Sequence, residues 1–200
     1  MKKTVKILCL LMALCFGIFF ASVVLDKRQL SNSVIRMHVV ADSDSQRDQA
    51  VKLKVKDAVV SYLASHMTEV EDIAEAKAYL DSNIDVLLEV ARDTLTAEGV
   101  DDPVSISLGR ESFPIRIYDT FTLPSGVYHS LRINIGEAAG RNWWCVVFPT
   151  LCMSAASGDD VAVSAFSDTL SETIHDPDEY EVRFLLLDWL GTLENFFFSR

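Results

Sequence analysis

Asn142-Trp143-Trp144-Cys145-Val146-Val147-Phe148-Pro149-Thr150-Leu151-Cys152 constrains the fold more than any other stretch, because it joins two adjacent tryptophans, a proline and two cysteines. Its aromatic and β-branched residues favour a strand as far as Phe148. Successive side chains of a strand point to opposite faces of the sheet. Trp143 and Trp144 therefore cannot share one core, and we expect the sheet to be covered or bound on both faces.

The two cysteines of this stretch are candidates for a disulfide bond. A bend at Phe148-Pro149 would place Cys145 opposite Cys152 on neighbouring strands, at a separation that a disulfide can span. Such a bond forms in an oxidising compartment, so the location of the chain decides the outcome. A rival interpretation makes Cys145 a thiol nucleophile with His38 as its base.

The N-terminus predicts export. Three lysines precede an uncharged apolar run over residues 7–25, and charged residues 26–28 end it. The run approaches the roughly 20 residues that cross a bilayer, and small residues at a cleavage site are hard to find. We expect residues 1–28 to be an uncleaved membrane anchor, with a cleaved signal peptide as the alternative. Residues 29–33 would then be a short polar tether to a domain over residues 34–200, outside the cytoplasm.

The exported part is strongly acidic. All 29 Asp and Glu residues follow residue 25, against 15 of the 18 Lys and Arg residues, which gives a formal charge near −14. Nucleic-acid affinity comes mostly from phosphate contacts, and anionic lipid attracts basic segments, so neither matches this surface as a whole. We expect a protein or cell-wall partner, no nucleic acid and no small-molecule substrate.

Hydrophobic periodicity beyond the leader predicts an α+β fold, a single domain in which a mainly antiparallel sheet packs with several helices. Strands are predicted where β-branched residues or a period of two recur, over residues 34–40, 104–108, 113–117, 127–135 and 143–148. Pro114 places the third of these at a sheet edge. The glycine-bounded loop Gly136–Arg141 joins the last two strands, which we expect to pair as a hairpin.

Helices are predicted from capping residues and apolar stripes. Ser45 begins the first. Thr68 begins the second, which is expected to run as one long stripe to Gly99. A third helix is predicted over residues 161–174.

Asp176-Pro177 begins the last predicted helix, because Asp is a favoured cap and proline a favoured first helical residue. The apolar surface of this helix is too wide to be fully solvated. We expect most of it, including Trp189, to pack on the sheet. The terminal Phe196–Phe198 would be left for a partner or a membrane surface.

The acidic turn Asp42–Gln46 and the loop residue Glu137 are candidates for chemistry. The turn has carboxylates at calcium-loop spacing, but it lacks the glycine at the sixth position and the glutamate at the twelfth. The same residues suit a strand-to-helix turn. Glu137 has no second carboxylate paired with it by spacing, as a cell-wall hydrolase would need. We therefore expect no metal, no cofactor and no catalytic residue.

The tryptophan stretch is the candidate for recognition of a partner. Tryptophan in a strand often serves a core, but paired tryptophans also bind protein or sugar. The candidate partner-binding residues join the loop to this stretch: Glu137, Arg141, Asn142, Trp143 and Trp144. Aromatic residues at the centre of a contact contribute most to binding, so the outward tryptophan is expected to matter most.

Short sequence blocks in a fixed order resemble the stage II sporulation protein R family. The stretch Ile35–Ser45, followed by Lys52–Val59, is similar to the amino-terminal signature of that family. Later blocks agree in order: Phe113-Pro114, Leu123–Tyr128, Leu131-Arg132, Ile135–Glu137, Asn142–Cys152 and Tyr180–Phe184. The similarity covers nearly the whole exported part. The family pattern usually has Asn where this chain has Asp42, a conservative change at a turn.

This resemblance implies a signalling role in sporulation. Proteins of the family are made in the forespore and exported into the space between the two sporulation membranes. There they activate a membrane-embedded aspartic protease of the mother cell, which processes the precursor of the early mother-cell sigma factor. The resemblance implies a signal and not an enzyme, and it assigns no contact residue. A cell-wall-directed hydrolase or a glycan-binding module is the alternative.

Overall fold

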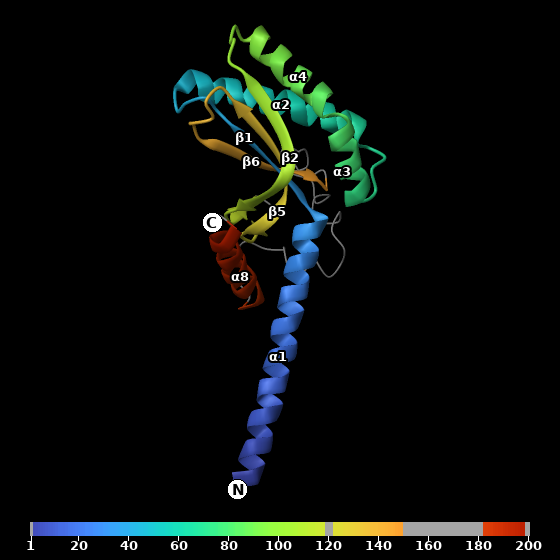
Figure 1. The fold of residues 1–200 in the computed structure, drawn as a ribbon, viewed down its shortest axis with the longest axis vertical. Coiled ribbons are helices and arrows are strands. Elements are labelled where there is room, and N and C mark those ends of the chain that lie inside the picture. Colours follow the sequence, from blue (N-terminus) through green and yellow to red (C-terminus); the bar gives the residue numbers. More distant parts are fainter. Residues whose placement is uncertain (1, 119–121, 150–181, 199–200) are drawn as a thin grey trace.

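The structure is a computed structural model that describes residues 2–118, 122–149 and 182–198. A long helix, α1 (Lys2–Ser33), leads into an α+β domain (Figure 1). Its four-stranded sheet has the order β2-β5-β1-β6. These strands are β2 (Val104–Phe113), β5 (Gly126–Ile135), β1 (Ile35–Val40) and β6 (Asn142–Phe148). Only β1 and β5 pair in parallel, so the predicted mainly antiparallel sheet is confirmed.

The predicted hairpin between β5 and β6 is wrong, because β1 lies between them. Val39 pairs with Ile133 of β5 on one side and with Trp143 of β6 on the other. Every residue of β1 is buried, as in a strand that is paired at both edges and covered on both faces. The loop between β5 and β6 therefore crosses the end of β1.

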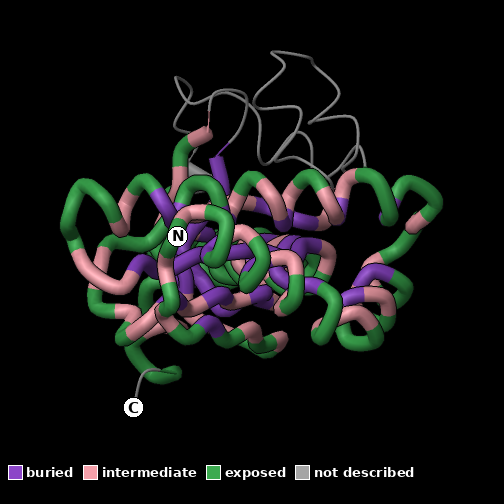
Figure 2. Tube along the Cα trace, turned by 90° about the horizontal axis from the view of Figure 1, so that it is seen from above, coloured by how far each residue is buried: buried purple, intermediate pink, exposed green. Residues whose placement is uncertain are grey.

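One face of the sheet packs against α2 (Gln46–His66), α3 (Ile73–Ser82) and α4 (Ile84–Ala97). Alternate residues of β1 and β5 supply the sheet side of this core, among them Met37, Val39 and Ile133. Apolar positions of α2 and α4, such as Val55 and Leu87, supply the helix side. Figure 2, which looks down on the domain from above, shows the buried residues concentrated in its interior.

The helix starts are partly as predicted. Ser45 caps α2, where its side chain accepts the backbone N–H of Asp48. Thr68 is not the next cap. Asp72 takes that role, since it accepts from the N–H of Glu75 at 2.9 Å, while the Glu75 carboxylate accepts from the N–H of Glu71.

The predicted single stripe up to Gly99 is interrupted between α3 and α4. The break falls at Asn83, whose side-chain amide donates to the carbonyl of Tyr79 at 2.8 Å. Such side-chain bonds to the backbone compete with the helical pattern. The second predicted helix therefore begins one turn later than expected, and it is divided into the two helices α3 and α4.

The opposite face of the sheet carries a smaller core. Leu30 of α1 and Val34 contribute to it, together with Phe113, Tyr128 and Val146 from the strands. The last turn of α1 is thus part of the domain. Residues 29–33, expected to be a tether, are helical.

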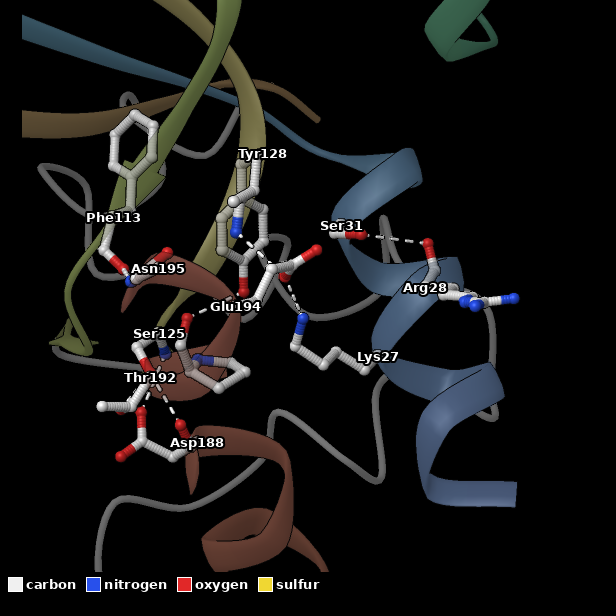
Figure 3. A network of polar contacts seen from close by, with 12 residues as sticks. Lys27, Arg28, Ser31, Phe113, Ser125, Tyr128, Asp188, Thr192, Glu194 and Asn195 are labelled. Atoms are coloured by element: carbon white, nitrogen blue, oxygen red, sulfur yellow. Dashed lines mark hydrogen bonds and ion pairs between the residues drawn. The ribbon is translucent and has the colours of Figure 1, made fainter. Parts of the chain in front are cut away.

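Strands β3 (Arg116–Ile117) and β4 (Thr122–Leu123) form a second, two-stranded sheet. Residues at the end of β2 and next to β4 make polar contacts with α8 (Val182–Phe198). The N–H of Ser125 donates to the Asp188 carboxylate at 2.9 Å, and the Asn195 amide donates to the carbonyl of Phe113 at 2.9 Å (Figure 3). Lys27 of α1 pairs with Glu194. The predicted start at Pro177 and the predicted helix over residues 161–174 lie outside the described residues.

The prediction that Trp189 packs on the sheet is wrong. Its side chain is 55% exposed and that of Leu193 is 38% exposed, whereas Leu187 is fully buried. The helix rests on Leu187, Gly191 and its polar residues, because these form the side that meets β5 and the chain before it.

We expect Trp189→Ala to change the free energy of unfolding by less than about 0.5 kcal/mol, as surface substitutions do. Leu187→Ala, on the buried side of the same helix, should cost about 2–5 kcal/mol. Urea unfolding of both variants in detergent would measure the difference. Equal losses would mean that α8 is rotated relative to this description.

Candidate partner-binding site

The loop Gly136–Arg141 is fastened to the turn Ala41–Ser45 that follows β1. The backbone N–H of Ala139 donates to the carbonyl of Asp42 at 3.0 Å, and that of Gly140 donates to the carbonyl of Ala41 at 2.9 Å. Two carboxylates continue the contact: Asp42 accepts the N–H of Glu137 at 2.7 Å, and Asp44 accepts the N–H of Arg141 at 2.7 Å. We call these two segments the loop–turn assembly.

These bonds explain the acidic turn without a metal ion. Asp42 and Asp44 use their oxygens on backbone donors of the loop, and Ser45 caps α2. Within the described ranges, no group of three or more His, Cys, Asp or Glu side chains is placed to hold a metal ion.

Two glycines allow the close approach of loop and turn. Gly136 has φ +58°, and a Cβ there would lie 2.0 Å from Oδ1 of Asp42. A Cβ on Gly140 would lie 2.3 Å from the backbone oxygen of Ser43. Both distances are far below van der Waals contact, so larger residues would separate the two segments.

Lys52 of α2 also binds the loop, through a hydrogen bond to its backbone. Its side chain is buried, and its Nζ donates to the carbonyl of Arg141 at 2.9 Å and to the Gln49 side chain at 2.6 Å. Burial, and secondly the charge of Arg141, lower the pKa of Lys52. The loop–turn assembly is therefore fixed by several directional bonds before any partner arrives.

Asp42→Ala is expected to cost about 1–3 kcal/mol of unfolding free energy, because it removes a charged acceptor from the N–H of Glu137. Asp42→Asn keeps an oxygen acceptor at that position and should cost less. Urea unfolding and amide hydrogen exchange at Glu137 would measure both effects. If the two variants exchanged equally fast, the Asp42 side chain would not be what fastens the loop.

The two tryptophans lie on opposite faces of the sheet, as predicted. Trp143 is 40% exposed, and the Nζ of Lys56 on α2 lies 5.0 Å from its ring centroid. Trp144 stacks on His38 at 5.0 Å with an interplanar angle of 7°, and it meets Phe113 edge-on at 5.2 Å. Trp143 is thus the outward tryptophan.

The structure brings four of the five candidate partner-binding residues together. Glu137, Arg141, Asn142 and Trp143 are all exposed, and they follow one another across the end of the sheet. Trp144 is half-buried on the other face, so it is not part of this exposed group.

The rival pairing of Cys145 with His38 is wrong. His38 pairs across the strands with Trp144, whereas Cys145 pairs with Met37, so the sulfur and the imidazole belong to opposite faces. Cys145 is disulfide-bonded, and its predicted partner Cys152 lies outside the described residues. The pairing with Cys152 stays a prediction.

A charged cluster on the face opposite α2 was missed by sequence reasoning. His38 Nε2 lies 2.6 Å from a carboxylate oxygen of Glu111, and Arg132 Nη1 lies 3.7 Å from the same oxygen. His38 and Glu111 are 73 residues apart, and no motif marks Glu111. Only the pairing of β2 with β5, and of β5 with β1, brings them together.

The hydrogen bond with His38 is the main reason that the pKa of Glu111 lies below its ordinary value, and the charges of His38 and Arg132 add to the effect. The folded state therefore favours the carboxylate. Its stabilisation is present above the ordinary pKa near 4.5 and is lost as the pH falls through the lowered folded value.

Glu111→Gln should be less stable than the unchanged chain at neutral pH, and the gap should narrow as the pH falls below about 4.5. Glutamine keeps an acceptor for His38 and removes only the charge. Urea unfolding of both proteins down to about pH 3 would show the trend. A gap that is independent of pH would assign the loss to packing.

Comparison with known proteins identifies the family of this chain. A family model of stage II sporulation protein R matches residues 31–158, which contain all the strands described above. A protein of Bacillus subtilis (strain 168) named Stage II sporulation protein R is 28% identical over 222 residues, covering 96% of this chain and 99% of that protein. No solved structure matches the chain. The matched range includes the loop–turn assembly and both tryptophans, and on this match the chain belongs to the stage II sporulation protein R family.

Proposed function

We propose that this chain is an exported sporulation signal that activates a membrane-embedded aspartic protease across the space between two membranes. The forespore makes and exports it, and the protease lies in the mother-cell membrane. The activated protease then processes the precursor of the mother-cell sigma factor. In this reading the chain acts by binding, and it carries out no chemical step itself.

The observation that carries the proposal is the placement of the exposed loop at the end of the sheet opposite α1. Helix α1 is long and apolar enough to cross a membrane by length and composition. It ends at Ser33, and β1 leaves it directly at Ile35. The loop–turn assembly lies at the other end of β1, which six residues place about 20 Å further on (Figure 1).

This geometry suits a ligand that is anchored in one membrane and is bound by a receptor in another. The loop is fastened by backbone and carboxylate bonds, so little conformational freedom is lost when a partner binds it. Trp143 supplies a large, rigid apolar surface at its border. The hydrolase alternative needs a pair of catalytic carboxylates. Glu137 is exposed, and the Asp42 carboxylate beside it already accepts a backbone N–H, so these two residues do not support that alternative.

Co-production of the full chain with the matching protease and its precursor substrate, in a host that does not sporulate, tests the proposal. Processing of the precursor should require the exported chain. A matched control carries Leu10→Arg and Leu14→Arg, which interrupt the apolar run and should block export. Absent processing with a folded, exported chain would refute the proposal, as would equal processing without it.

A further inference from the structure

Helix α8 turns its hydrogen-bonding residues, together with Leu187 and Gly191, toward the domain, and it turns a broad apolar side outward. Its two described acidic residues, Asp188 and Glu194, bind Ser125 and Lys27, and Asn195 binds the backbone of Phe113. The outward side is apolar and exposed: Leu185, Trp189, Leu193, Phe196, Phe197 and Phe198. A helix at a water-facing surface normally has the reverse arrangement.

The position of α8 indicates what covers this side. Glu194 is paired with Lys27, and Lys27 also lies close to Gly126 at the start of β5. Lys27 follows the last residue of the apolar run, Leu25, by two positions, or about 3 Å along the helix axis. If α1 spans a bilayer, this pair lies at the membrane surface.

Figure 1 shows α8 at the base of the sheet, on the same side as α1, and Figure 3 shows the two helices joined through Lys27 and Glu194. The apolar side of α8 therefore lies at about the depth at which α1 enters the membrane. Tryptophan and phenylalanine are favoured at this depth, because their rings bury in the boundary between headgroups and acyl chains.

We propose that the apolar side of α8 docks into the surface of the same membrane that α1 spans. The contact is hydrophobic, because the exposed side chains described from Leu185 onward on this side are uncharged. It therefore does not depend on attraction between the acidic domain and the lipid headgroups. The domain is then held at the bilayer by both α1 and α8, with the loop–turn assembly pointing away from it. This inference rests on the membrane anchor of the proposed function, and not on the identity of the receptor.

Fluorescence quenching by brominated lipid tests the contact. The full chain with Trp143→Phe and Trp144→Phe retains Trp189 as its only tryptophan. It is reconstituted into phosphatidylethanolamine–phosphatidylglycerol vesicles whose acyl chains carry bromine close to the headgroup or near the chain end. Trp189 should lose most of its emission with bromine close to the headgroup, and less with bromine near the chain end. A matched variant, Trp189→Phe, reports Trp143 and Trp144 instead and should be quenched little by either lipid.

Two free thiols, Cys9 and Cys15, are exposed on α1. With Cys9 replaced by serine, Cys15 shows in the same vesicles whether the anchor is inserted. A water-soluble maleimide should not reach it. If Cys15 is protected and Trp189 is not quenched, α8 does not contact lipid and this inference alone fails. If Cys15 reacts, the anchor of the proposed function fails, and this inference fails with it. Trp189 that is shielded from lipid, with Trp189→Cys cross-linking between copies, would assign the surface to a second copy and overturn the proposal.

Discussion

Trp143→Ala is expected to abolish precursor processing in the co-production assay without unfolding the domain. Trp143 is 40% exposed at the border of the loop–turn assembly. Exposed aromatic residues at the centre of a protein contact commonly cost 2 kcal/mol or more when they are truncated, and a loss of about 2 kcal/mol weakens affinity roughly 30-fold. The melting temperature should change little, because the lost surface is largely solvated.

Glu137→Gln tests the enzymatic alternative, since it keeps the volume and hydrogen-bonding capacity of this exposed side chain and removes only its charge and its ability to transfer a proton. It should reduce processing far less than Trp143→Ala does, because a ligand that acts by binding transfers no proton. The reverse pattern, with Glu137→Gln inactive and Trp143→Ala active in folded proteins, would support an enzymatic role. Circular dichroism of each variant establishes that it is folded.

Gly191→Ala is expected to displace α8 from the domain. A Cβ at this position would lie 1.6 Å from the backbone oxygen of Ser125 and 2.3 Å from its carbonyl carbon. Backbone atoms cannot move aside as a flexible side chain can, so the helix itself must shift. Overpacking of this kind typically costs about 1–3 kcal/mol, and here the bonds of Ser125 with Asp188 would also be stretched.

Gly109→Ala is the matched control, because a Cβ on Gly109 of β2 would meet nothing within 4 Å. It should change the free energy of unfolding by less than about 0.5 kcal/mol. Urea unfolding would compare the two variants. Should Gly191→Ala prove as stable as Gly109→Ala, α8 would not pack on the backbone of Ser125.

Features that depend on neighbouring residues were predictable from the sequence. The Ser45 cap, the strand at β5 and the opposite faces of Trp143 and Trp144 follow from local geometry, and the structure confirms each. Local patterns can still predict the wrong start of a helix when two of them lie close together. Thr68-Glu71 and Asp72-Glu75 have the same capping spacing, and only the second begins a helix.

The face of α8 that is buried was not predictable, because the helix is apolar on more than one side. Burial of Leu187 rather than Trp189 depends on Gly191, which lets the helix approach Ser125, and on acceptors and donors supplied by other segments. Periodicity measures only how apolar each side is. It contains no information on which side finds a matching surface.

By itself, the sequence determined the class of the fold, the apolar N-terminal segment and the presence of a glycine-bounded loop beside an outward tryptophan. Tertiary structure alone decided that β1 separates β5 from β6, and the candidate site follows from that insertion. Because β1 ends beneath the loop, Asp42 and Asp44 meet backbone donors almost a hundred residues later in the chain. The order of strands depends on which arrangement pairs the backbone hydrogen-bonding groups at the strand edges and also covers the apolar faces of the sheet. This is a property of the assembled sheet rather than of any one segment.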